Sequence, residues 1–320
     1  MSREHRSRQE ARPGRSLVAR AWPALLLAAC GPPAQDAIDA AELARVVSPD
    51  AELELLAGDL GFVEGPVWTD EEGGYLVFSD IRGGRLLRWT AAAGVELYRS
   101  PSPEPNGNAR DAEGRLLTCE HAARRVTRIE RDGSGTVLAD RYRGKRLNSP
   151  NDVVVAADGA VWFTDPPYGI PRGQVQEQAG SYVFRIDPVT LAPSVVITDF
   201  DRPNGLCFAP DGRILYVADS GVPGHVRAFD VGPSGALSGD RIFYASAWGH
   251  PDGIRCDADG RLYVASADGV HVVLPDGRLI GRLRTLEPAR NLCFGEADRR
   301  TLFVTAGSSL YSIRLEVSGP

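Results

Sequence analysis

Several signals that define other protein classes are missing from this 320-residue sequence. No apolar run reaches the roughly 20 residues that a membrane-spanning helix needs, and no long helical period appears after residue 57. Basic residues are not in excess either: 36 Lys and Arg face 42 Asp and Glu, which gives a net charge of -6. The sequence therefore predicts neither a transmembrane nor a helical protein, and it lacks the basic footprint of a nucleic-acid-binding domain.

Cysteine is scarce, with five in the chain, and its spacing excludes a zinc cluster. Cys119, Cys207, Cys256 and Cys293 lie in short strand-like apolar runs, and none belongs to a CxxC pair. An even number of cysteines in an oxidising compartment is compatible with one or two disulfides. Because all four lie in apolar surroundings, we expect buried free thiols instead.

The first 30 residues differ from the rest of the chain. Residues 1–20 carry six Arg and two Glu, and an apolar stretch over residues 21–29 leads into Cys30 and Gly31. This order is typical of a lipoprotein signal peptide over residues 1–30, whose lipobox leaves a lipidated Cys30. The alternative is an alanine-rich leader that is cleaved elsewhere. We expect a tether over residues 31–50 and an exported lipoprotein, in the periplasm or on the outer face of a membrane.

One pattern recurs six times along the rest of the chain. Each copy has a polar opening residue, a short apolar strand, a turn that is mostly of the Asp-Gly type, and a second apolar strand, which is a strong hairpin signal. Successive copies begin 39 to 53 residues apart, the period of a four-stranded blade. The sequence thus predicts an all-β, six-bladed β-propeller over residues 51–320. We expect the strand-like residues 52–57 to close the ring by adding an outer strand to the last blade.

The opening residues are expected to meet at the central channel, because the inner strands of a propeller begin on one side of it. They are Glu64, Asn106 or Asn108, Asn151, Asn204, Asp252, and Arg290 or Asn291. Carboxylate and amide oxygens without Cys or His suit a hard cation such as Ca²⁺ or Mg²⁺. The alternative is that Asn-Gly and Asp-Gly only form turns. Glu64 argues for a metal site, since Glu is a poor turn former.

The chain resembles the regucalcin and gluconolactonase family of six-bladed propellers at Glu64-Gly65-Pro66 and at residues 148–152, 202–206 and 251–254. Residues 118–121 and 162–169 resemble the bacterial gluconolactonase branch. The resemblance implies one divalent cation on Glu64, Asn151, Asn204 and Asp252, with Ca²⁺ expected and Mg²⁺, Mn²⁺ or Zn²⁺ as alternatives. It also implies that Asp252 is the catalytic acid/base or nucleophile. Ser149 stands where the animal branch has a sugar-contacting arginine, so sugar recognition is expected to differ.

The expected activity is hydrolysis of a small-molecule sugar lactone by a monomeric enzyme. The cation would polarise the lactone carbonyl, and Asp252 would take the proton of the attacking water. The alternatives are phosphoester or organophosphate hydrolysis at the same site, or a noncatalytic anchored propeller that binds a ligand. Structural roles for His121 and His250 also stay open. The expected substrate contacts are Asn106, Glu120, His121, Asp165, Tyr168 and His250.

Substitution Cys30→Ser is expected to abolish lipidation and to release the protein from membranes, because the Cys30 thiol would carry the lipid. Mass spectrometry of the mature N-terminus measures this directly. An unmodified N-terminus at any residue other than Cys30 would contradict the anchor.

Overall fold

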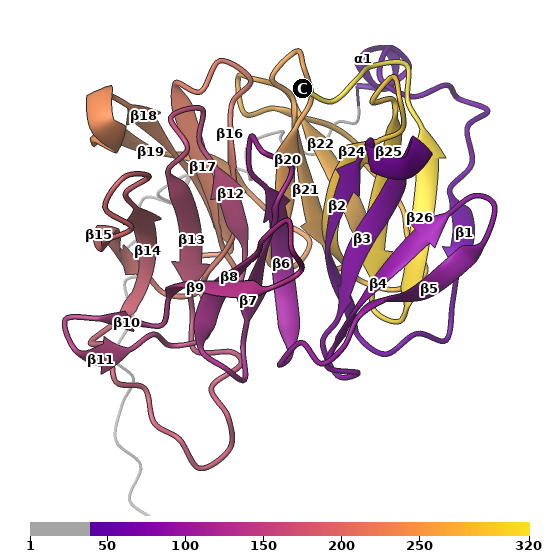
Figure 1. Cartoon of the computed structure of the whole chain (residues 1–320). Coiled ribbons are helices and arrows are strands. Elements are labelled where there is room, and N and C mark those ends of the chain that lie inside the picture. The colour runs from indigo at the N-terminus through magenta and orange to yellow at the C-terminus, as the bar shows by residue number, and fades with distance from the viewer. Residues whose placement is uncertain (1–38) are drawn as a thin grey trace, which may run out of the picture. The chain divides into compact units, whose positions relative to one another are not determined.

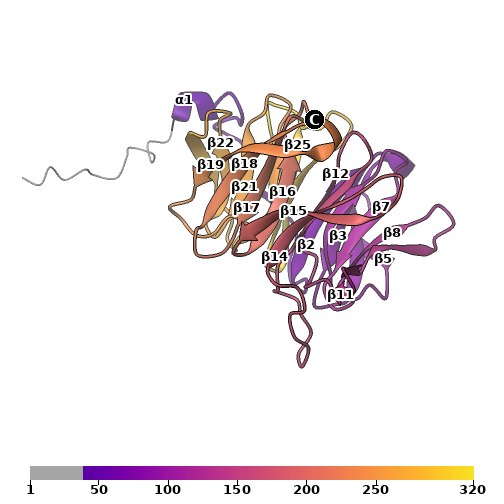
Figure 2. The same cartoon turned by 90° about the vertical axis from the view of Figure 1, so that its left-hand side faces the viewer.

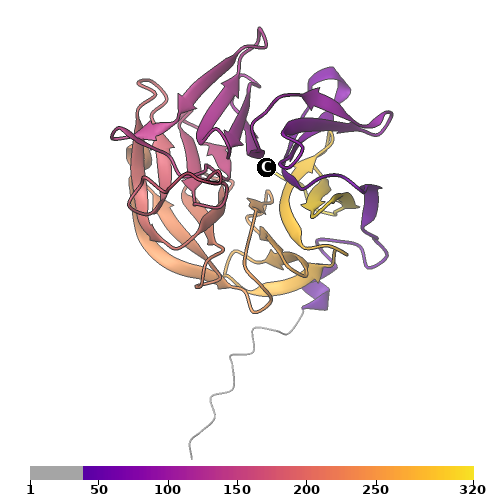
Figure 3. The same ribbon diagram turned by 90° about the horizontal axis from the view of Figure 1, so that it is seen from below.

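The computed structural model describes residues 39–320, so the expected signal peptide and Cys30 lie outside the described residues. Within this range the strands form six four-stranded antiparallel sheets and one two-stranded hairpin. Figure 3 shows the sheets as blades around a central axis. The expected all-β, six-bladed propeller is confirmed.

Within each blade, the strands follow one another from the axis outward. They are β2 (Val63–Thr69), β3 (Tyr75–Asp80), β4 (Arg85–Thr90) and β5 (Gly94–Arg99) in blade 1; β6 (Pro105–Arg110), β7 (Leu116–Glu120), β8 (Arg125–Ile129) and β9 (Gly135–Ala139) in blade 2; β12 (Val153–Val155), β13 (Val161–Asp165), β14 (Ser181–Ile186) and β15 (Pro193–Phe200) in blade 3. They continue with β16 (Pro203–Phe208), β17 (Ile214–Asp219), β18 (His225–Val231) and β19 (Leu237–Ala245) in blade 4; β20 (Ile254–Cys256), β21 (Leu262–Ser266), β22 (Gly269–Val273) and β23 (Leu279–Leu283) in blade 5; β24 (Ala289–Gly295), β25 (Thr301–Ala306) and β26 (Ser309–Arg314) in blade 6.

Few elements lie outside the blades. The short hairpin of β10 (Arg141–Tyr142) and β11 (Lys145–Arg146) stands between blades 2 and 3. The described helices are α1 (Ala40–Leu43) and two 3₁₀ turns, Glu71–Gly73 and Pro233–Gly235. In Figures 1 and 2 the long connection between β13 and β14 extends from one face of the ring, and the C-terminus lies at the other.

An N-terminal strand closes the ring. Strand β1 (Glu54–Ala57) pairs antiparallel with β26, placing Leu55 opposite Tyr311 and Glu54 opposite Ser312. It thereby becomes the outer strand of blade 6, whose order is β1-β26-β25-β24. The strand pairing agrees with the expected closure. Without β1, the backbone groups of β26 would form an exposed sheet edge.

The core lies between neighbouring blades, where each sheet covers the next. Trp68 of blade 1 stacks on Phe303 of blade 6 with ring centroids 5.4 Å apart, and Trp162 of blade 3 meets Phe208 of blade 4 edge-on at 5.7 Å. A buried side chain of this size contributes ~2–3 kcal/mol to stability. Apolar burial between blades therefore holds the ring together all the way round.

The described part of the expected tether is packed against the propeller. Val46 is completely buried and Val47 is 7% exposed, both in the cluster shared by blades 5 and 6. The Glu316 amide donates a hydrogen bond to the Val46 carbonyl (2.8 Å), and the Asp39 amide donates to that of Ile280 (3.1 Å). The prediction of a tether is therefore wrong for residues 39–50, because apolar side chains there complete the core.

The four described cysteines are buried free thiols, as expected. Cys207 and Cys256, on the inner strands of blades 4 and 5, have their sulfurs 3.9 Å apart. Within residues 39–320, no helix has the length and hydropathy needed to cross a membrane.

A chain that begins at Gly58 is expected to unfold at least about 5 °C below one that begins at Asp39. It loses Val46 and Val47, each worth ~1.5–3 kcal/mol of buried apolar surface, and it exposes the edge of β26. Differential scanning calorimetry of the two chains measures the difference. Equal melting temperatures would mean that blade 6 does not need β1.

Candidate active site at the propeller axis

The opening residue of the inner strand faces a cavity of about 500 Å³ at the axis in all six blades. In blades 1, 2, 4 and 5 the residue just after the second strand faces this cavity as well. The other lining residues come from the loops that follow β3, β13, β19 and β23, from the residue before β2 and from the start of β24. The lining residues are Phe62, Glu64, Ile81, Arg82, Asn106, His121, Asn151, Tyr168, Asn204, Ser220, Gly249, His250, Asp252, Ala267, Pro288, Ala289 and Arg290.

The glycine after an opening residue is required by the close approach of neighbouring blades. The Gly205 amide donates to the Asp252 carbonyl of the next blade (3.1 Å), and the Gly107 amide donates to that of Asn151 (2.7 Å). A Cβ on Gly205 would lie 2.4 Å from the Asp252 carbonyl oxygen. Both glycines lie within strands, β16 and β6. Asn106-Gly107 and Asn204-Gly205 therefore belong to strands and do not form turns.

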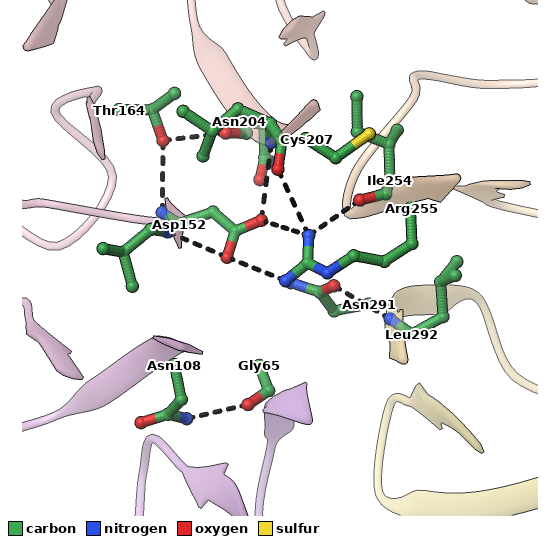
Figure 4. A network of polar contacts seen from close by, with 12 residues as sticks. Gly65, Asn108, Asp152, Thr164, Asn204, Cys207, Ile254, Arg255, Asn291 and Leu292 are labelled. Carbon is green, nitrogen blue, oxygen red and sulfur yellow. Dashed lines mark hydrogen bonds and ion pairs between the residues drawn. The ribbon is translucent and has the colours of Figure 1, made fainter. Parts of the chain in front are cut away.

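Blades 3 and 6 have Asp152 and Asn291 where the other four blades have this glycine. Asp152 is completely buried. The Arg255 guanidinium reaches it from blade 5, with Nη1 3.1 Å from Oδ2, and also donates to the Ile254 carbonyl (2.7 Å). Figure 4 shows this ion pair between the inner strands. Arg255 also lines a second cavity, formed by residues further along the inner strands.

Neighbouring inner strands are tied by side chains as well. The Asn108 amide nitrogen donates to the Gly65 carbonyl of blade 1 (2.8 Å), and the Thr164 hydroxyl donates to the Asn204 carbonyl of blade 4 (2.7 Å). Asn108 thus serves the framework, whereas Asn106 faces the cavity. This resolves the choice between these two residues.

Two carboxylates, Glu64 and Asp252, share the cavity. Glu64 is 5% exposed, and the neighbouring Gly65 amide donates to its carboxylate (3.1 Å). Burial raises the pKa of Glu64 well above its usual range, and the negative charge of Asp252 raises it further. Burial also raises the pKa of Asp252 to about 7, although Arg290, with Nη1 3.5 Å from Oδ2, opposes the shift. The pair therefore favours a positive charge between or beside its members.

Asn106, His121 and Tyr168 form another part of the cavity wall. The amide nitrogen of Asn106 lies 3.0 Å from Nε2 of His121. Burial lowers the pKa of His121 to about 4, so its imidazole is neutral at pH 7. The Tyr168 hydroxyl also stays protonated, because burial raises its pKa to about 12. Both groups can therefore hydrogen-bond a neutral, hydroxyl-rich ligand.

Tyr168 reaches the cavity because the start of the β13–β14 connection is fixed. The Ser149 hydroxyl donates to the Pro166 carbonyl (2.6 Å) and accepts from the Gly169 amide (2.8 Å). Ser149 therefore positions this segment and is not itself among the residues that line the cavity.

Eight of the ten residues expected at the site line this cavity, and Glu120 and Asp165 do not. Both end the second strand of their blade, the place that Asp80 and Asp219 take in blades 1 and 4. The Glu120 carboxylate accepts from the Ser102 hydroxyl (3.1 Å), and that of Asp165 accepts from the Asn148 amide (2.7 Å). An acid at this position therefore holds the loop that leads into the inner strand.

Sequence reasoning did not single out Phe62, Arg82 and Ser220 as lining residues. Ser220 directly follows the loop-holding Asp219, just as His121 follows Glu120. Because successive residues of a strand point to opposite sides, the residue after the acid turns toward the cavity. This periodic signal is visible in the sequence. Phe62 and Arg82 lie in connections without a repeated pattern.

The donor set of the cavity fits a hard cation. Within residues 39–320, no three His, Cys, Asp or Glu side chains cluster as metal ligands. The expected set has only two carboxylates, and its other donors are the amides of Asn151 and Asn204, which line the same cavity. Oxygen donors of this kind match Ca²⁺ or Mg²⁺. Burial is the main cause of the raised pKa values of Glu64 and Asp252, and a bound cation would favour the ionised form of both carboxyls.

Six blades around an axial cavity with convergent polar groups define a propeller of the enzyme type. Over residues 62–308 the chain matches the family described as SMP-30/Gluconolactonase/LRE-like region, and it belongs to this family. The gluconolactonase of Zymomonas mobilis is 30% identical over 305 residues, 87% of this chain and 85% of that protein.

Other relatives agree with this assignment. A gluconolactonase structure from Xanthomonas campestris is 39% identical, with a TM-score of 0.82, covering 87% of this chain and 94% of that one. Regucalcin of Gallus gallus is 28% identical, covering 77% of this chain and 83% of that protein. The expected family and the expected class, a lactone-hydrolysing enzyme, are confirmed.

Substitution Asp165→Asn is expected to raise the melting temperature increasingly between pH 4 and pH 7. Burial raises the pKa of Asp165 to about 7, while an unfolded aspartate titrates near 4. The folded protein binds the extra proton in this range, so its stability falls as the pH rises. Calorimetry at several pH values measures the effect, with Asp50→Asn at an exposed site as the control. A rise in melting temperature that is the same at every pH would contradict a buried Asp165 carboxyl that binds a proton in the folded state.

Proposed function

We propose that this protein hydrolyses a sugar lactone with the help of one divalent cation, and that Asp252 is the base. The observation that carries the proposal is the pair of largely buried carboxylates, Glu64 and Asp252, in one cavity with the Asn151 and Asn204 amides. The gluconolactonases among the relatives support a lactone as the substrate.

Glu64, Asn151, Asn204 and Asp252 would hold the cation, with Ca²⁺ as the first candidate. A cation bound there supplies Lewis-acid polarisation of the lactone carbonyl and stabilises the negative charge that develops on its oxygen. The loose, two-carboxylate donor set leaves room for a substrate oxygen beside the protein ligands.

Asp252 accepts the proton of the attacking water and returns it to the ring oxygen as the ester C–O bond breaks. Without a cation, burial raises the pKa of Asp252 to about 7. A bound cation would lower this pKa and keep the carboxylate ionised, as a base requires. The Arg290 guanidinium, 3.5 Å from the Asp252 carboxylate, orients it and favours its ionised form. Asn106, the neutral His121 and the protonated Tyr168 bind the sugar hydroxyls, since each presents a polar group to the cavity.

Substitutions at the two carboxylates separate the duties of base and ligand. Asp252→Asn is expected to lower turnover of glucono-δ-lactone on the order of 10²–10⁴-fold at saturating cation, the usual loss for a general base. Glu64→Gln is expected mainly to weaken cation binding, so excess cation restores part of its activity. Calorimetric cation titration and lactone hydrolysis, measured on the same metal-stripped samples after Ca²⁺, Mg²⁺, Mn²⁺ or Zn²⁺ is restored, report both effects.

The exposed Asp50→Asn variant is the matched control for loss of one carboxylate. Near-normal turnover of Asp252→Asn at saturating cation would remove Asp252 as the base. Activity that survives complete metal removal would exclude the cation. Hydrolysis of aryl phosphates but of no lactone would favour the phosphoester alternative, and no turnover of either would favour a ligand-binding propeller.

A further inference from the structure

The cavity has a cationic side that the proposed hydrolysis of a neutral sugar does not use. Arg82, in the turn between β3 and β4, and Arg290, on β24, both line it. Their guanidinium carbons lie 5.4 Å and 5.3 Å from the centroid of the same ring, that of Phe62. Both guanidinium groups thus contact the Phe62 ring, on the side of the cavity formed by blades 1 and 6.

Neither guanidinium forms a close ion pair with a carboxylate of the described residues. Within residues 39–320, Arg82 forms no ion pair, although Arg85, only three residues away, pairs with Asp80 at 3.0 Å. Arg290 has one long contact, 3.5 Å, with Asp252, and its buried Nε has no hydrogen-bond partner among the described residues. Most arginines of the blades pair more closely, as Arg115 does with Asp111 at 2.7 Å.

With the proposed divalent cation bound, the cavity carries two more positive charges than negative ones. The cation would balance the charges of Glu64 and Asp252. Arg82 and Arg290 then add positive charges that no other acid among the lining residues balances. Such a group on a cavity wall attracts an anion, and a guanidinium fork is well shaped for two oxygens of a carboxylate or phosphate.

We propose that Arg82 and Arg290 form an anion subsite that binds a negatively charged substituent of the lactone. The preferred substrate class would be lactones that carry a carboxylate or a phosphate ester in addition to the ring ester. This inference rests on the proposed lactone hydrolysis. A cavity of about 500 Å³ has room for a six-carbon lactone of this kind.

The subsite is tested by kcat/KM for three lactones: neutral glucono-δ-lactone, a glucarolactone with a free carboxylate, and 6-phosphogluconolactone with a phosphate ester. We expect at least one charged lactone to be preferred about tenfold or more at low salt, because electrostatic attraction between exposed charges is screened as ionic strength rises. Comparison of the lactone that carries a carboxylate with the one that carries a phosphate shows which anion the subsite binds.

Arg82→Gln is expected to lower the preference for the charged lactone about tenfold, mainly through KM. Arg88→Gln is the matched control, since Arg88 lies on β4 of the same blade, pairs with Glu96 and is not among the lining residues. A wild-type enzyme without charge preference, or a preference that survives Arg82→Gln, would overturn the subsite.

Calorimetric titrations with glucarate and with gluconate distinguish failure of the anion subsite from failure of the proposed lactone hydrolysis. Glucarate binding that depends on Arg82, in a protein that hydrolyses no lactone, would overturn the lactonase proposal and support the subsite. Efficient hydrolysis of the neutral lactone together with equal binding of both acids would support the lactonase and overturn the subsite.

Discussion

The close approach of the inner strands at the axis is the constraint on which the rest of the molecule depends. Backbone amides of one blade donate directly to carbonyls of the next, as Gly205 does to Asp252 and Gly253 to Arg290 (2.7 Å). There is no room for a Cβ at these contacts. The carbonyl of each opening residue is thereby fixed, so its side chain has a defined direction into the cavity. The packing that holds the ring together therefore also arranges the site.

Electrostatics at the axis follow from the same geometry. Asp152 occupies a glycine position and is completely buried, and Arg255 crosses from blade 5 to pair with it. Removing one partner of such a pair typically costs 3–5 kcal/mol. At the cavity, Glu64 has no ion pair among the described residues, and Asp252 has only the 3.5 Å contact with Arg290. Burial raises the pKa of both carboxyls. The site thus holds two weakly paired carboxyl groups where a ligand can reach them.

Much of this arrangement was predictable because the repeat is strongly periodic. The turn spacing indicated the blades and the opening residues, and the strand-like residues 52–57 indicated the closing strand. Glu120 and Asp165 were misplaced for a local reason: neighbouring residues at a strand end face opposite sides, and sequence alone did not show which faced the cavity. The tether predicted over residues 31–50 is wrong for residues 39–50 because the buried pair Val46-Val47 is too short an apolar run to stand out in the sequence. Arg82 follows no repeated pattern, so only the assembled ring brings it to Phe62.

The pairing of β1 with β26 in blade 6 constrains the order in which the propeller can assemble. Strand β1 precedes every blade in the chain, yet its partner β26 is the last strand of the propeller. The sixth sheet can therefore assemble only after the strands of the other five blades have been synthesised, and contacts between such distant segments form slowly. The axial cavity is accordingly complete only when the two ends of the propeller have met.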